Sequence, residues 1–359
     1  MGKYKLINNV LGWIVFAIAS TVYLMTMEPT ASFWDCGEFI SSAYKLEVGH
    51  PPGAPFFMLT ANLFTQLASD PSTVAKMVNT MSALFSGLTI LFLFWSITHL
   101  ARKIMVKDGE EASLGQMITV MGSGLVGALA YTFSDTFWFS AVEGEVYAYS
   151  SLFTAVVFWL ILKWEAVADK PHADRWIVLI AYLMGLSIGV HLLNLLCISA
   201  IVLVYYYKKF PNPTMKGTLV ALLASFAIVA LMMYGVVQGL VEVCGYFELL
   251  FVNVLGMPYN SGVFAYVTIV AGVLIWSIWE TMRDEIHPTR MKIAFILSVV
   301  LIGIPFIGSG YVLAVILTAA LSLYLFKSKK VDIKTLNTIL VCLMVVVVGY
   351  SSYALTLIR

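Results

Sequence analysis

The chain contains eleven apolar segments, each long enough to cross a bilayer, and polar loops separate them. Hydrophobic residues make up 60% of the sequence and charged residues only 11%, whereas a soluble domain usually has about 25% charged residues. We therefore predict an all-α integral membrane protein that crosses the membrane many times. The expected spans are residues 8–27, 78–101, 115–133, 147–163, 176–191, 193–207, 217–240, 261–279, 292–307, 311–326 and 335–357.

The charges are distributed unevenly between the loops. If Lys3 and Lys5 lie in the cytoplasm and every segment crosses, 18 of the 21 Lys and Arg residues are cytoplasmic, and only Lys45, Lys76 and Arg359 are outside. The 20 acidic residues divide evenly, so the asymmetry is the positive-inside bias of membrane proteins. Carboxylates thus outnumber fixed cations on the outer face, where we expect the chemistry. The net charge of +1 gives no reason to expect a nucleic-acid partner.

The first outer loop, residues 28–77, is the longest and is expected to contain juxtamembrane helices. Residues 56–69 are apolar, but fourteen helical residues rise only about 21 Å, less than the ~30 Å hydrocarbon core. We predict a re-entrant or interfacial helix there. Residues 35–48 form an amphipathic pattern that suits a helix lying flat on the membrane, and the prolines of residues 50–55 end it.

The predicted spans carry no Asp, Glu, Lys or Arg near their middle. Ion-coupled transporters generally keep ionisable groups at that depth. A lipid or lipid-linked glycan transporter is therefore disfavoured but remains the alternative function, and a non-enzymatic scaffold is a third. Chemistry at the outer surface agrees better with the sequence.

Asp35 and Glu38 follow the first span and admit two interpretations. They match a capping box, in which Asp35 caps a helix and Glu38 reaches back to the cap nitrogen. Alternatively, a carboxylate tethered at the membrane surface acts as a general base or a metal ligand. The two interpretations compete for Asp35, because a capping interaction would occupy its oxygens.

A second acidic pair, Glu143 and Glu145, precedes Tyr147 at the start of the fourth span. The acids are either ordinary helix N-terminal residues, favoured by the helix dipole, or a second acidic group that binds a cation or a substrate hydroxyl. Further candidates for binding substrate on the same side are Lys45, His50, His191 and Asn194.

Four motifs occur in one order along the chain, at residues 28–39, 49–55, 139–147 and 189–194. Together they resemble a large bacterial membrane family that includes the animal transmembrane protein 260, a protein O-mannosyltransferase. That family is similar to the GT-C glycosyltransferases, which use polyisoprenyl-phosphate sugars. The resemblance implies a single GT-C-like transmembrane domain over residues 1–359, and a soluble outer domain beyond it in many members.

The resemblance implies that Asp35 is the catalytic acid of the first outer loop, with Glu38 as the alternative, and that Glu143 and Glu145 are the second-loop acids. The expected reaction is transfer of a monosaccharide, with inversion, from a polyisoprenyl-phosphate to a hydroxyl, such as a Ser or Thr of an exported protein or a glycan. No cofactor is required by this scheme. Mg²⁺ or Mn²⁺ held by Asp35, Glu143 and Glu145 is the metal-dependent version. We expect the bacterial inner membrane with a periplasmic active site, or alternatively the endoplasmic reticulum with a lumenal one.

Overall fold

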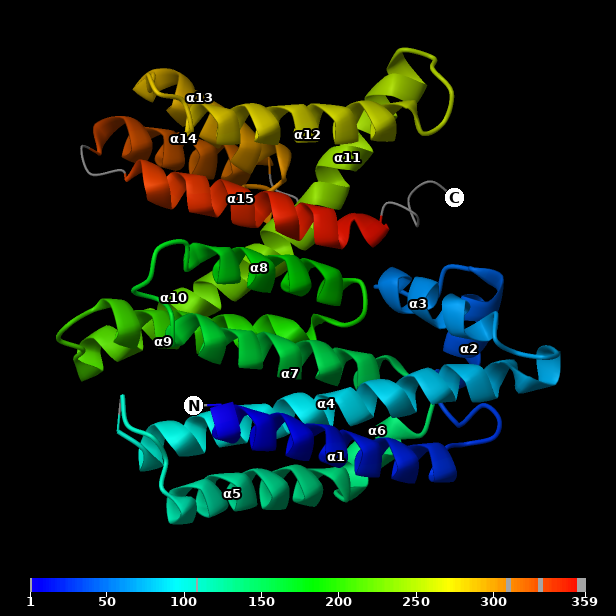
Figure 1. Cartoon of the computed structure of the whole chain (residues 1–359). Coiled ribbons are helices and arrows are strands. Elements are labelled where there is room, and N and C mark those ends of the chain that lie inside the picture. Colours follow the sequence, from blue (N-terminus) through cyan, green and yellow to red (C-terminus); the bar gives the residue numbers. More distant parts are fainter. Residues whose placement is uncertain (1, 108, 308–310, 329–331, 354–359) are drawn as a thin grey trace. The chain divides into compact units, whose positions relative to one another are not determined.

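The computed structural model describes residues 2–107, 109–307, 311–328 and 332–353, and these residues contain helices but no strand (Figure 1). The chain forms two compact units. Within the described residues, the first unit extends to Cys197 and includes the stretch from Gly349, and the second runs from Ile198 to Val348. The predicted all-α membrane class is confirmed.

The first unit holds the helices that surround the candidate residues. They are α1 (Gly2–Thr26), α2 (Cys36–Lys45), α3 (Pro55–Thr65), η1 (Pro71–Thr73), α4 (Val74–Met105), α5 (Leu114–Thr132), α6 (Asp135–Ala141), α7 (Val146–Glu165), α8 (Asp174–Ile188), η2 (Leu192–Leu196) and η6 (Ser351–Tyr353). The long helix α4 is central, because α1, α5 and α7 all pack along it (Figure 1).

Local sequence sets several of the helix ends. The carboxylate of Asp70 accepts the backbone N–H of Ser72 and starts the turn that leads into α4. Arg102 and Lys103 occupy the last turn of α4, where the helix dipole favours cations. The Ser113 side chain caps α5 in a capping box.

Two hydrophobic clusters hold the first unit together, one on each side of α4. The first joins α2, α3, α4 and α7, with Phe39 and Phe57 in edge contact at 5.4 Å. The second joins α1, α4, α5 and α6 around Tyr23, whose hydroxyl donates to the Thr132 carbonyl at 2.9 Å. The segments between α1 and α4 and between α5 and α7 are thereby fixed to the long helices.

The helix predicted at residues 35–48 forms, but it does not lie on the membrane surface in the way that its pattern predicted. It forms as α2, but its apolar residues Phe39, Ile40 and Ala43 are buried against α3 and α4 rather than facing lipid. Tyr44 and Leu46 are exposed. The amphipathic pattern identified the buried face, but another helix of the protein covers it. The short helix expected at residues 56–69 is α3, of 11 residues.

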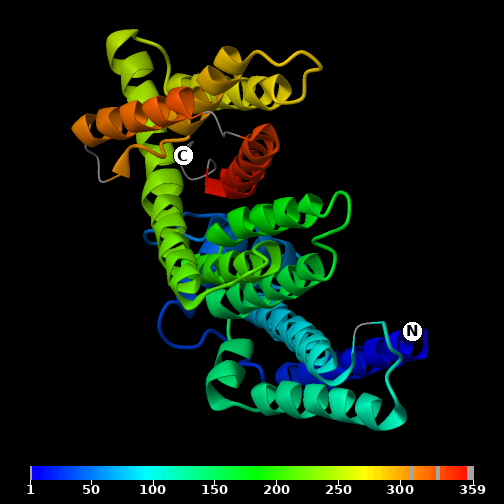
Figure 2. The ribbon, with the colours of Figure 1, turned by 90° about the vertical axis from the view of Figure 1, so that its left-hand side faces the viewer.

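The second unit consists mainly of long apolar helices. They are α9 (Cys197–Lys209), α10 (Met215–Ala230), η3 (Leu231–Gln238), α11 (Gly239–Leu249), η4 (Leu250–Val254), α12 (Ser261–Glu280), α13 (Pro288–Leu301), α14 (Tyr311–Lys327) and α15 (Ile333–Tyr350). From α10 to η4 the backbone forms one 40-residue rod (Figure 2). At about 60 Å, it is roughly twice the hydrocarbon thickness, so the predicted span 217–240 covers only part of it.

Eight of the helical stretches in the described residues are long and apolar enough to cross a membrane. Each overlaps a predicted span. The other three predicted spans correspond to the shorter helices α8, α13 and α14, of 15, 14 and 17 residues. These helices rise only about 21 to 26 Å, so a count of eleven crossings is not confirmed.

Candidate functional site

Asp35 lies at the start of α2, directly after Trp34, whose backbone φ of 61° is in the left-handed region. The backbone of Asp35 is helical, with φ −81° and ψ −4°, whereas a residue that caps with its side chain is usually extended. Its carboxylate makes no capping hydrogen bond, so the capping box predicted for Asp35 and Glu38 is wrong. The exposed side chain stays available to a substrate.

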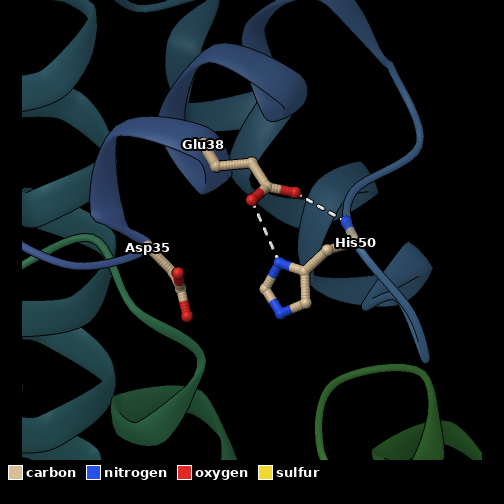
Figure 3. Close-up of side chains that lie close together, drawn as sticks. All are labelled: Asp35, Glu38 and His50. Atoms are coloured by element: carbon tan, nitrogen blue, oxygen red, sulfur yellow. Dashed lines mark hydrogen bonds and ion pairs between the residues drawn. The ribbon is translucent and has the colours of Figure 1, made fainter.

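Glu38, the alternative catalytic acid, binds the loop that follows α2. Its Oε1 accepts the backbone N–H of His50 at 2.6 Å, and its Oε2 lies 3.0 Å from Nδ1 of the same histidine (Figure 3). These hydrogen bonds lower the pKa of Glu38, and the carboxylate raises the pKa of His50. Gly49 is tightly placed, because a Cβ there would lie 3.2 Å from Glu38 Oε1.

Asp35, Glu38 and His50 converge on one space at the start of α2 (Figure 3). One ligand atom from each lies within 4.8 Å of the others, so the three could hold a divalent cation. Carboxylate and imidazole donors suit Mn²⁺ better than Mg²⁺, which prefers oxygen. This set differs from the predicted one of Asp35, Glu143 and Glu145, because the two glutamates are buried in other contacts.

Glu143 and Glu145 lie in the turn between α6 and α7 and are only 5% and 6% exposed. Glu145 caps α7, since its backbone is extended and its Oε2 accepts the Val146 N–H at 3.1 Å. The side chains of Ser32 and Cys36 lie close to Glu143 and act to lower its pKa, but burial outweighs them. Burial raises the pKa of Glu143, and it raises the pKa of Glu145 to about 7. Glu145 is therefore both a helix cap and an acid that exchanges its proton near neutral pH.

A pocket of about 280 Å³ brings the two acidic motifs together. Its walls combine three carboxylates with exposed aromatic rings, including Phe33 and Trp34, which are 87% and 91% exposed. A site of this kind can contact a polar group through the acids and an apolar chain through the rings. The lining residues are Phe33, Trp34, Asp35, Phe139, Ser140, Glu143, Glu145 and Tyr147.

The remaining predicted residues lie at different depths. The ring of His191 lies 5.5 Å from that of Tyr147, and its Nδ1 accepts the Leu193 N–H. Lys45 is exposed in the last turn of α2. Asn194 was expected to face the outer cavity, but it is 0% exposed and donates to Ser187. Because its side chain is closed off from solvent, the structure gives it a structural role.

Sequence reasoning missed Asn79, which positions the segment before Asp35. Its Nδ2 donates to the carbonyls of Glu28 at 2.7 Å and Thr30 at 3.0 Å, so α4 holds the loop. Its Oδ1 is near Gly144, where a Cβ would lie 3.0 Å away. A lone asparagine inside an apolar span was the available signal.

Comparison with known proteins gives one family. The family model described as the protein O-mannosyl-transferase TMEM260 N-terminal domain matches residues 35–214, a range that contains every site residue predicted from the sequence. No solved structure matches the chain.

Two relatives carry the same description. The protein O-mannosyl-transferase TMEM260 of Mus musculus is 28% identical over 174 residues, which are 48% of this chain and 22% of the relative. The protein O-mannosyl-transferase tmem260 of Dictyostelium discoideum is 25% identical over 187 residues, 50% of this chain and 21% of the relative. The similarity thus spans about a fifth of the length of the relatives that it matches.

Proposed function

The chain belongs to the protein O-mannosyl-transferase TMEM260 N-terminal domain family, and from that membership we propose that it is a membrane glycosyltransferase. The proposed donor is a polyisoprenyl-phosphate sugar, with mannose as the sugar because the relatives are named mannosyl-transferases. The proposed acceptor is a hydroxyl, such as a Ser or Thr of an exported protein. The observation that carries the proposal is the pocket in which Asp35 meets Glu143 and Glu145 beside exposed aromatic rings.

Asp35 is proposed as the general base. Its carboxylate is exposed in the pocket and is not used for capping, whereas both oxygens of Glu38 are occupied by His50. In the proposed step, the acceptor oxygen bonds to the anomeric carbon and gives its proton to Asp35. The bond from that carbon to the phosphate oxygen breaks on the opposite face, and its electron pair leaves with the lipid phosphate. This in-line displacement inverts the anomeric centre.

The leaving phosphate needs positive charge, and His50 is the proposed source. The hydrogen bond from Glu38 raises the pKa of His50, so more of the imidazole is protonated at neutral pH. Glu38 is therefore a positioning residue for His50. Lys45 is exposed in the last turn of α2 and is a second cation on the same side.

Glu143 and Glu145 are proposed to bind the sugar hydroxyls. With a pKa of about 7, Glu145 is protonated part of the time at neutral pH, which reduces its repulsion of the donor phosphate. The protonated form can also donate a hydrogen bond. Tyr147 lines the pocket beside these acids, and the ring of His191 packs against it. Phe33 and Trp34 are proposed to contact the donor lipid or the bilayer interface.

A divalent cation is the second way to stabilise the phosphate, favoured by the convergence of Asp35, Glu38 and His50. We propose the metal-free scheme first, because protonation of His50, favoured by its contact with Glu38, can supply the positive charge. A chelator separates the two schemes. Loss of transfer on chelation, with recovery on Mn²⁺ addition, would favour the cation.

The test of the base is Asp35→Asn in the purified full-length chain, assayed for mannosyl transfer from polyprenyl-phosphate mannose to a Ser/Thr peptide. Loss of a general base lowers turnover by about 10²–10⁴-fold. The matched control is Asp135→Asn, which removes an exposed acid in the first turn of α6, outside the pocket. Near-normal turnover of Asp35→Asn would refute the base assignment.

The transporter alternative makes a different prediction. It requires movement of a lipid-linked sugar across vesicle membranes without cleavage of the sugar–phosphate bond, and it tolerates Asp35→Asn. The outer side of the site rests on the charge bias of the loops. That side is the periplasm in a bacterial inner membrane or the lumen in an endoplasmic-reticulum membrane.

A further inference from the structure

A second pocket, of about 430 Å³, lies in the first unit at the opposite ends of the helices that carry the acidic site. Its walls come from the start of α1 and the ends of α4 and α7. Glu145 caps one end of α7 and Lys163 lies near the other, 18 residues and about 27 Å away. Since the hydrocarbon core is ~30 Å thick, this spacing and the charge bias of the loops predict that the pocket lies at the level of the inner head groups. The lining residues are Tyr4, Lys5, Asn8, Asn9, Trp95, Thr98, His99, Arg102, Trp159 and Lys163.

The lining of this inner pocket is basic and contains no acid. Lys5, Arg102 and Lys163 contribute the fixed cations, and the imidazole of His99 lies beside them in the same lining. None of these four forms an ion pair with an acid in the part of the chain that the structure describes. Glu165, at the end of α7, pairs instead with Lys103 at 2.6 Å. Three cations that converge with no acid among the lining residues create a positive potential that attracts an anion.

Aromatic rings hold the cations in place. The Arg102 guanidinium lies 4.5 Å from the ring centre of Tyr4, and the Lys163 ammonium lies 4.8 Å from that of Trp159. Trp159 in turn packs on Trp95 at 5.8 Å. The charges are thus arranged before any ligand arrives, which lowers the entropy cost of binding.

Two further features of the inner pocket and its surroundings indicate what kind of ligand it binds. Oδ1 of Asn8 is buried and has no hydrogen-bond partner, so the pocket offers an acceptor for a hydroxyl as well as cations for a phosphate. The neighbouring surface of α1 is apolar and exposed at Leu6, Val10 and Trp13. A ligand with a phosphate, a hydroxyl and hydrocarbon chains matches all three features.

We propose that the inner pocket binds the phosphate-bearing head group of an anionic phospholipid, with the acyl chains along the exposed face of α1. Arg102 takes two phosphate oxygens, because its planar guanidinium suits bidentate contact, and Lys163 adds a point charge. Asn8 accepts a head-group hydroxyl. This site is independent of the glycosyl transfer proposed for the outer pocket.

The experiment measures lipid binding to the purified full-length chain by native mass spectrometry. The probe is anionic phosphatidylglycerol, and zwitterionic phosphatidylcholine serves as the comparison. Arg102→Gln and Lys163→Gln are each expected to weaken phosphatidylglycerol binding about 5-fold, and the double variant about 30-fold. Phosphatidylcholine binding should be weaker in the wild type and should change less, because its choline cation is repelled by the basic lining. The matched control is Lys103→Gln, which removes an adjacent charge that pairs with Glu165 and does not line the pocket.

Asn8→Leu is a second variant, which keeps every charge and removes the buried acceptor. It is expected to weaken phosphatidylglycerol more than phosphatidic acid, which lacks the glycerol hydroxyls. Equal losses of phosphatidylglycerol affinity in Lys103→Gln and in the double variant would overturn the proposal. Binding would then depend on the general positive charge of the surface rather than on the pocket. Inorganic phosphate or glycerol 3-phosphate that competes at concentrations similar to the lipid would also overturn it, because the pocket would be a site for soluble anions.

Discussion

The substitution Glu145→Gln should stabilise the protein, and increasingly so as the pH rises. Glutamine keeps an oxygen that can accept the Val146 N–H and cap α7, but it cannot ionise. Wild-type Glu145 is 6% exposed, and burial raises its pKa from 4.5 to about 7. The ionised form is therefore less favourable in the folded state than in the unfolded state.

The sign and size of the effect follow from proton linkage. Well below pH 4.5 the carboxyl is protonated in both states and contributes nothing. Between pH 4.5 and 7 the unfolded chain loses the proton while the folded chain keeps it, so the free energy of unfolding of the wild type falls. At about 1.4 kcal/mol per tenfold change in proton affinity, the loss is about 1 kcal/mol at pH 5 and about 3 kcal/mol at pH 8.

The assay is thermal or denaturant unfolding of the purified full-length chain at pH 5, 6, 7 and 8. The advantage of Glu145→Gln over the wild type should grow across this series. Glu47→Gln, which neutralises an exposed acid between α2 and α3, should show no such growth. A Glu145→Gln advantage that stays constant with pH, or reverses, would refute the burial argument.

Three more changes test the surroundings of the pocket. Gly144→Ala should lower both thermal stability and transfer, because the new Cβ would lie within 3.0 Å of two side chains. The control Gly122→Ala places a Cβ with nothing within 4 Å in a helix interior, so it should stabilise the protein by up to about 1 kcal/mol. Equal melting temperatures of the two variants would contradict the steric argument. Asn79→Ala should cost about 1–3 kcal/mol by leaving two loop carbonyls without their donor, measured by unfolding. Glu38→Gln should lower the pKa of His50 in an NMR titration, and the loss of transfer activity at alkaline pH should then begin at a lower pH. An unchanged His50 titration would show that Glu38 does not raise the pKa of His50.

Much of the fold could be predicted because the relevant signals are local. Apolar runs of about 20 residues define membrane helices, and all eight stretches that are long enough to cross were predicted from them. Three acids that the sequence motifs singled out, Asp35, Glu143 and Glu145, line one pocket, and their functional roles stay predictions. The three short helices α8, α13 and α14 limited the prediction, because hydropathy does not reveal where a helix ends.

The partners of the side chains could not be predicted. The sequence placed Glu38 at a capping position, but the folded loop brings His50, 12 residues away, within hydrogen-bond distance and leaves Asp35 free. It placed Asn194 on the outer surface, but packing buries it against Ser187.

The sequence by itself determined the class of protein and the motifs, because hydrophobic length, charge and residue type are properties of neighbouring residues. Only the tertiary structure decided which acids are buried and which carboxylate is free. The turn that holds Glu145 is buried because it packs against α2 and α4, since a Cβ at the neighbouring Gly144 would lie 3.0 Å from Ile40 and 3.0 Å from Asn79. Such long-range contacts leave no periodic pattern in a single sequence.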